Sequence, residues 1–183
     1  MIVPTPCLQS CKRNNIRPTR FLLTVRIPDQ AVSLFKKNSA SLRLRVEYHF
    51  QKKFRCSTSR FGIGQTEGSN CTPLGLHRIA EKIGGGWPAG AVFKSRQLTG
   101  FTWQGMPDAK ITTRILWLEG LEPDFNRGGD VDSFARYIYI HGTGDETTLG
   151  RPASRGCIHL AADDLMPLFD RLPVGTLVWI TDR

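Results

Sequence analysis

The chain has 183 residues, of which 40% are hydrophobic and 22% are charged. This balance fits one folded domain and excludes both a disordered tail and a bundle of membrane helices. Lysine and arginine number 25 against 16 aspartate and glutamate residues, giving a net charge of +9 that attracts polyanions such as nucleic acid, anionic lipid or an acidic cell-wall polymer. No nucleic-acid-binding motif accompanies the charge, because the sequence has neither paired Cys/His fingers nor a basic helix.

The N-terminal residues 1–19 are predicted to be a poorly patterned lead-in. Prolines interrupt them, and they lack the apolar stretch of a secretory signal. The whole chain has five cysteines, an odd number that would leave one thiol unpaired. A pairing of Cys56 with Cys71 stays open, because the sequence does not give their separation in space.

A period of two in the apolar residues begins at Phe21 and predicts a mainly β domain over residues 20–183. Residues 21–27 and 31–36 flank Pro28-Asp29-Gln30 and predict a hairpin. Alternating apolar and polar residues from Leu42 to Phe50 predict the next strand, with one face in the core and His49 on the solvent face. Further strand-like runs occupy residues 76–83, 91–98, 111–118, 137–140 and 176–181.

One short helix is predicted late in the chain. Asp163 or Asp164 is expected to cap it, and Leu165, Phe169 and Leu172 lie on one of its faces. The tryptophans are interpreted as core or groove-wall residues rather than as part of a cofactor site. They are Trp87, Trp103, Trp117 and Trp179.

Residues 140–160 carry the candidate chemistry. A strand ends at His141, a polar loop follows, and Ser154-Arg-Gly-Cys157 forms a turn before the next apolar pair. The thiolate is the reactive form of cysteine, and a neighbouring imidazole takes its proton, so Cys157 and His141 are predicted to be nucleophile and base. Gly156 permits a sharp turn whose amides converge on a developing oxyanion. A buried structural cysteine is the alternative.

His141-Gly-Thr followed by Ser154-Arg-Gly-Cys157-Ile-His-Leu resembles the signature of the L,D-transpeptidase catalytic domain family (YkuD, or ErfK/YbiS/YcfS/YnhG). Ser57-Thr-Ser followed by Thr72-Pro-Leu-Gly75 is similar to another segment of that family. The run from Asp132 to His141 is similar to its short, single-domain members. The resemblance covers nearly the whole chain and implies a β-sandwich-like fold.

The resemblance also implies a reaction. Cys157 attacks the third-residue carbonyl of a bacterial peptidoglycan tetrapeptide stem and expels D-Ala, with His141 as base and then acid. The acyl group passes to an amine of a neighbouring stem, giving a 3-3 cross-link that serves cell-wall organisation and cell shape. An L,D-carboxypeptidase that hydrolyses the same bond is the alternative. The family implies the periplasm or cell envelope, although no signal peptide is visible; no cofactor or metal, nucleic acid or transmembrane segment is implied.

Positioning residues are implied by the same resemblance. The Gly142 carbonyl orients the histidine, and the amides of Arg155, Gly156 and the nucleophile form the oxyanion site. Ser154 supports the turn, and Arg155 meets a substrate carboxylate. His159 stands where the family usually has Asn or Arg; tuning of the thiol, substrate contact and a structural role all stay open. The expected groove residues are Ser57, Asn70, Thr72, Thr143 and His159.

Two other classes of protein stay open. A zinc peptidase would use His141-x3-Asp145, but such enzymes also need a His-x-His motif, and here the second motif is Cys157-Ile-His159. A non-enzymatic, cationic module that binds cell wall would account for the net charge. It would leave the His/Cys arrangement unexplained.

Overall fold

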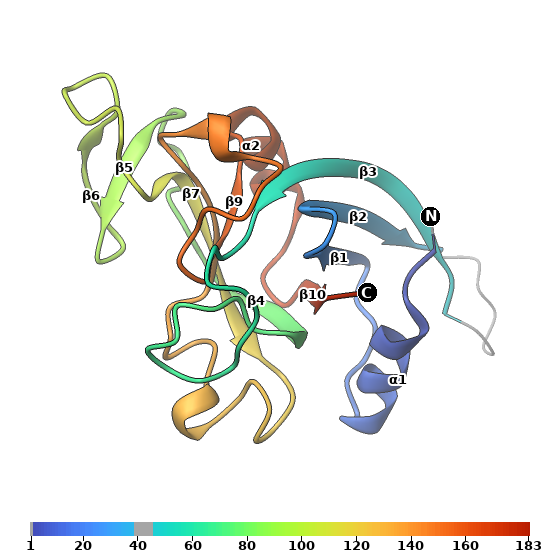
Figure 1. Ribbon diagram of the computed structural model, residues 1–183. Coiled ribbons are helices and arrows are strands. Elements are labelled where there is room, and N and C mark those ends of the chain that lie inside the picture. Colours follow the sequence, from blue (N-terminus) through green and yellow to red (C-terminus); the bar gives the residue numbers. More distant parts are fainter. Residues whose placement is uncertain (1, 39–45) are drawn as a thin grey trace.

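The computed structural model describes residues 2–38 and 46–183, and ten strands of these residues form one mixed sheet (Figure 1). The sheet order is β4-β10-β1-β2-β3-β9-β8-β7-β5-β6, and an additional β4–β7 pairing closes the first eight strands into a barrel. The predicted mainly β fold is confirmed. The strands are β1 (Phe21–Arg26), β2 (Ala31–Lys37), β3 (Tyr48–Ser57), β4 (Gly75–Ile83), β5 (Ala91–Lys94), β6 (Gln97–Phe101), β7 (Thr112–Gly120), β8 (Tyr139–Gly142), β9 (Ile158–Leu160) and β10 (Leu177–Thr181).

The predicted first hairpin is confirmed, because β1 and β2 pair antiparallel from Phe21↔Lys36 to Arg26↔Ala31. The next strand is shifted along the chain. β3 begins at Tyr48, whereas residues 42–45 of the predicted strand lie outside the described residues. His49 is exposed as expected, but Phe50 is 39% exposed and does not join the core as predicted. A bulge in the β2–β3 pairing shifts the register there, and a one-residue shift exchanges the two faces of a strand.

The predicted single strand over residues 91–98 is wrong. Residues in this region form a hairpin of β5 and β6 instead. Its turn residues Ser95 and Arg96 have φ of +49° and +68°. Neither residue type is typical of a two-residue hairpin turn, which favours Asn and Gly, so the sequence carries no turn signal at this point.

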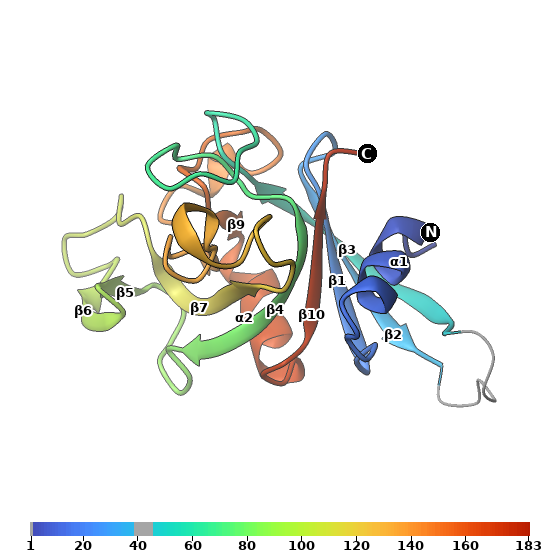
Figure 2. The same ribbon diagram turned by 90° about the horizontal axis from the view of Figure 1, so that it is seen from below.

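A helix, α1 (Thr5–Arg13), occupies the stretch predicted to be a poorly patterned lead-in. Cys7, Ser10 and Cys11 are buried on its inner face, at the spacing of successive helical turns. They pack against Leu22 and neighbouring apolar residues, and Figure 2 shows α1 beside β1 and β10. The pattern was missed because its buried positions hold two cysteines and a serine rather than large apolar residues.

The predicted late helix is confirmed as α2 (Ala162–Arg171), but its predicted cap is wrong. Neither Asp163 nor Asp164 caps it, since the N-cap position is Ala161 and carries no side-chain hydrogen bond. Glu146 supplies the missing acceptor from another segment, and its Oε1 accepts from the amide of Ala162 at 2.7 Å.

The barrel interior is filled with apolar side chains from its walls, and α2 adds Leu165, Leu168 and Phe169. All five cysteines are free thiols, so the Cys56–Cys71 pairing left open by the sequence is not formed. Within residues 2–38 and 46–183, no helix is long and apolar enough to cross a bilayer. The rigid wall of β7, β8 and β9 holds the residues considered next.

Candidate active site

Two neighbouring strands bring the candidate residues together. β8 and β9 pair in parallel with His141 opposite His159, and the centroids of the two imidazole rings are 4.7 Å apart. Cys157 directly precedes β9. These three residues line one cavity of about 400 Å³. Cys157 lies 16 positions after His141 in the sequence, and the pairing of β8 with β9 brings the two residues to one cavity.

His141 is held in one orientation. Its side chain is buried, and Nδ1 lies 2.7 Å from the carbonyl oxygen of Gly142. A carbonyl oxygen only accepts hydrogen bonds, so Nδ1 carries the proton and Nε2 keeps the basic lone pair. Burial, with a smaller contribution from the charge of His159, lowers the pKa of His141 to about 3. The imidazole is therefore neutral at physiological pH.

Cys157 is half-buried beside an apolar cluster that includes Ile115, Trp117 and Tyr139. Its sulfur lies 3.4 Å from the carbonyl oxygen of Tyr137. Burial raises the pKa of the Cys157 thiol to about 11, although a backbone hydrogen bond from Tyr139 and the nearby charge of an arginine oppose that rise. The free protein therefore holds a neutral thiol rather than a thiolate.

The turn that presents Cys157 is fixed from two sides. Ser154 Oγ donates to the carbonyl of Cys157 at 2.6 Å and accepts from the amide of Gly156 at 3.3 Å. Gly156 has φ of +116°, a conformation that favours glycine. Thr72 Oγ1 donates to the carbonyl of Gly156 at 3.0 Å. The amide of Gly156 is thus already occupied.

Arg136 was missed by the sequence analysis. Its guanidinium donates to the carbonyl oxygens of Gln65 at 2.5 Å and Cys71 at 2.8 Å, and so fastens the loop between β3 and β4. The carbonyl of Cys71 lies close against Gly156: a Cβ added at position 156 would be only 3.3 Å from this oxygen. Among the described residues Arg136 forms no ion pair with a carboxylate. Most of its partners are main-chain carbonyls distant in sequence, and such partners leave no sequence signal.

The predicted groove residues separate into two groups. Thr143 and His159 line the cavity. The lining of this cavity does not include Ser57, Asn70 or Thr72. Ser57 is buried and donates to Arg151 O at 2.7 Å, Thr72 is buried under the Cys157 turn, and Asn70 is exposed on the loop, where its carbonyl accepts from Ser59 Oγ.

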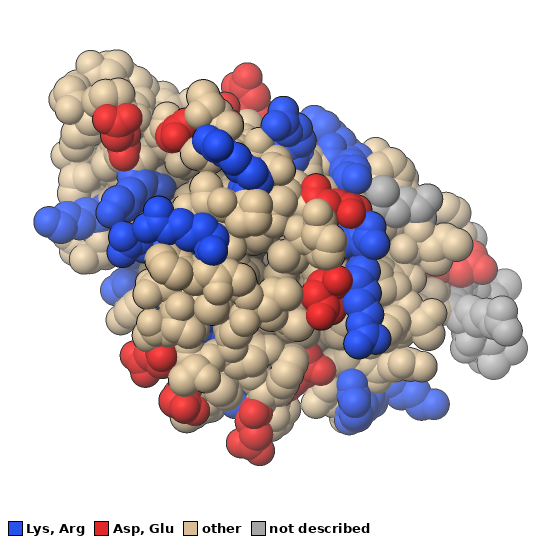
Figure 3. Space-filling view, in the orientation of Figure 1, with Lys and Arg blue, Asp and Glu red and all other residues tan. Residues whose placement is uncertain are grey.

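The rim of the cavity carries both signs of charge. Three cations line it, as do two carboxylates; they are Arg60, Lys110, Arg155, Asp108 and Asp145. Figure 3 shows the basic side chains of one face in several separate groups with acidic residues between them, rather than in one continuous patch. In the described part of the chain no three His, Cys, Asp or Glu side chains gather as metal ligands, so the zinc interpretation lacks a ligand set.

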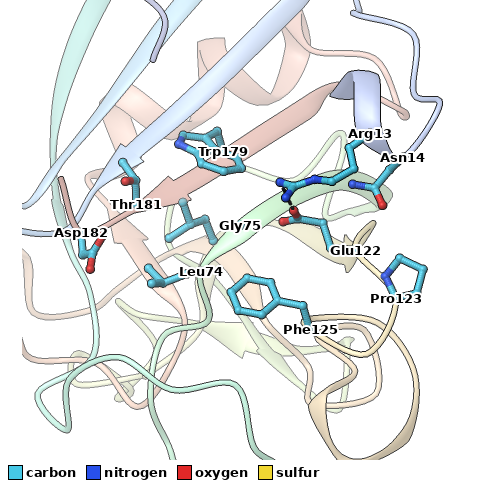
Figure 4. Close-up of a pocket in the computed structure, with 11 residues that line it drawn as sticks. Arg13, Asn14, Leu74, Gly75, Glu122, Pro123, Phe125, Trp179, Thr181 and Asp182 are labelled. Carbon is cyan, nitrogen blue, oxygen red and sulfur yellow. Dashed lines mark ion pairs between the residues drawn. The ribbon is translucent and has the colours of Figure 1, made fainter. Parts of the chain in front are cut away.

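A larger cavity of about 480 Å³ lies between the end of α1 and β10 (Figure 4). Its described lining residues include no cysteine or histidine. One of its two carboxylates, Glu122, accepts hydrogen bonds from Ser10 Oγ at 2.7 Å and the amide of Leu76 at 2.6 Å, and pairs with Arg13 at 3.9 Å. Glu122 therefore attaches α1 to the barrel.

Comparisons with known proteins agree with the geometry. The family model of the L,D-transpeptidase catalytic domain (YkuD) matches residues 20–180. The chain is 44% identical over 61 residues to the L,D-transpeptidase ErfK/SrfK of Salmonella typhimurium, which is 33% of this chain and 20% of that protein. It is 39% identical over 71 residues to YqjB of Bacillus subtilis, also named as an L,D-transpeptidase, which is 36% of this chain and 40% of that protein. The matches thus span well under half the length of these relatives.

A solved structure is similar in fold. L,D-transpeptidase 3 from Mycobacterium tuberculosis, in complex with a faropenem-derived adduct, matches with a TM-score of 0.52 and 14% identity. The match covers 88% of this chain and 60% of that chain. At this identity the likeness concerns the fold alone, and the fold is that of the L,D-transpeptidases.

Proposed function

Because the chain belongs to the L,D-transpeptidase catalytic domain (YkuD) family, whose members act on the cell wall, we propose that Cys157 is the nucleophile of a peptidoglycan transpeptidase. The observation that carries the proposal is the shared cavity of Cys157 and His141, in which Nε2 is the basic nitrogen of the histidine. Residues 20–183 would form the catalytic domain, acting in the cell envelope.

The first half of the reaction forms an acyl-enzyme. The stem's third-residue carbonyl lies over the Ser154–Cys157 turn, and the Cys157 thiol gives its proton to His141 as its sulfur bonds to the carbonyl carbon. The resulting oxyanion is stabilised by the amides of Arg155 and Cys157, because the Gly156 amide is bound to Ser154. Collapse breaks the C–N bond, and the proton on His141 passes to the departing D-Ala amine.

The second half returns the cysteine. An acceptor amine attacks the thioester carbon, His141 takes a proton from that amine, and the C–S bond breaks. The thiolate that leaves then recovers the proton held by His141, so the neutral pair is restored. Water in place of the amine would give the carboxypeptidase product from the same acyl-enzyme.

Both groups are neutral in the free protein, so the proton moves only as the carbonyl is attacked. The low pKa of His141 makes the transient imidazolium a strong acid, which suits protonation of a departing amine. The ring of His159 beside it contributes to that low pKa. Cationic side chains at the rim, Arg155 among them, would meet the carboxylates of the stem.

Arg136 acts through its neighbours as a positioning residue. Its contact with the carbonyl of Cys71 keeps the β3–β4 loop against Gly156, and that contact preserves the turn carrying Cys157. Its positive charge also lowers the pKa of the Cys157 thiol relative to the value that burial alone would give.

Mass spectrometry of products from purified tetrapeptide stems tests the proposal. We expect release of D-Ala, an acyl mass on Cys157, and stem dimers joined through a 3-3 bond. Stems shortened by D-Ala, without dimers, would indicate the carboxypeptidase. The absence of both D-Ala and the acyl-enzyme would reject the assignment of Cys157.

A further inference from the structure

An aromatic cluster lies exposed on the β5–β6 hairpin and the segments beside it. Trp87 packs edge-on against Phe101 at 6.2 Å between ring centroids, and Phe101 stacks on Trp103 at 4.7 Å. Trp87 is 44% exposed and Trp103 is 61% exposed, so of the two predicted positions, core or groove wall, neither residue takes the core position. Figures 1 and 2 both show β5 and β6 at the edge of the barrel. Clustered aromatic side chains left in water indicate a binding surface.

Trp103 also lines a groove of about 460 Å³. Thr143 lines this groove and also the cavity that holds Cys157 and His141. The groove is therefore an extension of the candidate active site, and a ligand that leaves the active-site cavity past Thr143 reaches the indole of Trp103.

The lining of the groove combines apolar residues with hydroxyl groups and carries little charge. Four threonines lie along it, together with Glu146, and its described lining residues include no lysine or arginine; the threonines are Thr102, Thr112, Thr113 and Thr143. Thr113 has φ of +68°, an unusual conformation for a β-branched residue, at an irregularity of β7. Such strained positions collect at binding and catalytic sites.

Several of these polar groups have hydrogen-bonding capacity left. Thr113 Oγ1 accepts from the amide of Gly90, but Thr102 Oγ1 has no hydrogen-bond partner within the described residues. Thr143 Oγ1 accepts from the amide of Asp145 and retains its own hydrogen for donation. Glu146 uses Oε1 for the amide of Ala162, which leaves Oε2 as an acceptor.

We propose that the groove between Trp103 and Thr143 binds the saccharide part of the substrate. A pyranose ring has an apolar C–H face that fits an exposed indole and a rim of hydroxyl and amide groups that fits threonines and a carboxylate. The stem peptides of peptidoglycan are attached to glycan, so a stem held at Cys157 brings a sugar with it. This inference rests on the proposed function for the link between the two sites. The binding of sugar itself is tested separately.

The first experiment measures binding without catalysis. A peptide-free tetrasaccharide of alternating N-acetylglucosamine and N-acetylmuramic acid is titrated into the ¹⁵N-labelled full chain, and the indole N–H signals of the tryptophans are followed by NMR. We expect the Trp103 signal to shift with saturation and the Trp179 signal to stay in place. No shift of the Trp103 signal up to millimolar saccharide would overturn the proposal.

Matched variants then locate the binding. Trp103→Ala should weaken saccharide binding about tenfold, which equals about 1.4 kcal/mol, and Trp103→Phe should restore most of it by keeping a flat ring. Phe125→Ala removes an exposed ring at the other cavity and should leave binding unchanged. Equal saccharide affinity for Trp103→Ala and the unmodified chain would overturn the proposal. A change from dimer to monomer in Trp103→Ala would also overturn it, because the aromatic cluster would then be an interface between copies of the chain.

Kinetics separate failure of this inference from failure of the proposed function. The ratio of kcat/KM for a disaccharide-linked stem to that for the free stem should exceed one and fall in Trp103→Ala. Turnover with a ratio of one in both proteins overturns the saccharide site and keeps the transpeptidase. Saccharide binding without turnover of either stem keeps the site and rejects the transpeptidase.

Discussion

The α1 cavity and the active-site cavity of this molecule are similar in volume but differ in chemistry. The larger, about 480 Å³, lies beside α1 and holds Glu122, whose two carboxylate oxygens accept hydrogen bonds from Ser10 and Leu76. The smaller, about 400 Å³, holds a thiol and two imidazoles, with Nε2 of His141 left as a base. Cavity volume therefore does not identify the reactive site. The site is identified by reactive side chains that are not already engaged in holding the fold together.

The side chains around the two cavities also have different roles. Side chains of the α1 cavity join a helix to the barrel, so they contribute to stability. Around Cys157 the supporting bonds come from Ser154, Thr72 and Arg136, which fix backbone and leave the thiol and imidazole available. Substitutions in the two cavities should therefore affect different measurements.

The largest effect on activity is expected from Cys157→Ala, a substitution in the active-site cavity. Loss of the nucleophile should lower kcat for stem peptides by at least about 10³-fold. Thermal unfolding should stay nearly unchanged, because the side chain is half-buried and loses only one sulfur. Steady-state kinetics and calorimetry on the same preparation check both. A large fall in Tm with residual activity would instead make Cys157 a packing residue.

Acylation by a penem or carbapenem is the next test. A related chain carries a faropenem-derived adduct, and we expect one such adduct on this chain, at Cys157. Intact-protein mass spectrometry followed by peptide mapping locates it. Cys71, a thiol of similar exposure in the β3–β4 loop, is the internal control and should stay unmodified. An adduct on Cys71 alone would contradict the assignment of the reactive thiol to the smaller cavity.

Arg136→Gln should lower kcat/KM by about ten- to a hundredfold through misplacement of the Cys157 turn. It should also raise the pKa of the Cys157 thiol above about 11, because a nearby positive charge that lowers this pKa is removed. The pH dependence of iodoacetamide labelling of Cys157 measures this pKa. Arg136→Lys separates the two effects, since it keeps the charge and loses the fixed pair of donors. An unchanged labelling profile in Arg136→Gln contradicts the electrostatic role.

Acid should destabilise the protein through its buried histidines. The pKa values of His77, His141 and His159 are lowered to about 4, about 3 and about 4, mainly by burial. An unfolded histidine has a pKa of about 6.5, so the unfolded chain binds more protons below that pH. The free energy of unfolding should fall as pH drops from about 6.5 to about 4, by up to about 1.4 kcal/mol per pH unit for each histidine.

Denaturant unfolding at several pH values measures that slope. His77→Gln should reduce it by about a third, since one of three such groups is removed. The exposed His49 provides the control, and His49→Gln should leave the slope unchanged. A flat profile over this pH range would show that the histidines are not held neutral.

The smallest effect on activity is expected at the α1 cavity. Glu122→Ala leaves the Ser10 hydroxyl and the Leu76 amide without their acceptor, so we expect a loss of about 2–3 kcal/mol in the free energy of unfolding. The kcat/KM for stem peptides, measured well below the Tm of the variant, should stay within about twofold of the unmodified chain. A large fall in kcat/KM at full folding would mean that the two cavities are coupled.

Local pattern in the sequence was enough to predict much of the fold. Period-two alternation predicted β1 and β2, short strand-like runs predicted β4 and β7, and an apolar helical face predicted α2, because these signals come from residues close together in the chain. The same holds for the candidate chemistry. His141 at a strand end and Cys157 after a glycine turn are adjacent-residue features, and the family resemblance rests on them.

Only the tertiary structure decided the rest. The parallel β8–β9 register sets His141 beside His159, Arg136 binds carbonyls about 65 to 70 residues away, and Glu146 caps α2 in place of the expected aspartates. The position of Trp103 in a groove that shares Thr143 with the active-site cavity is of the same kind. Each of these depends on which distant backbone groups become neighbours, and side-chain patterns along the chain do not encode main-chain partners.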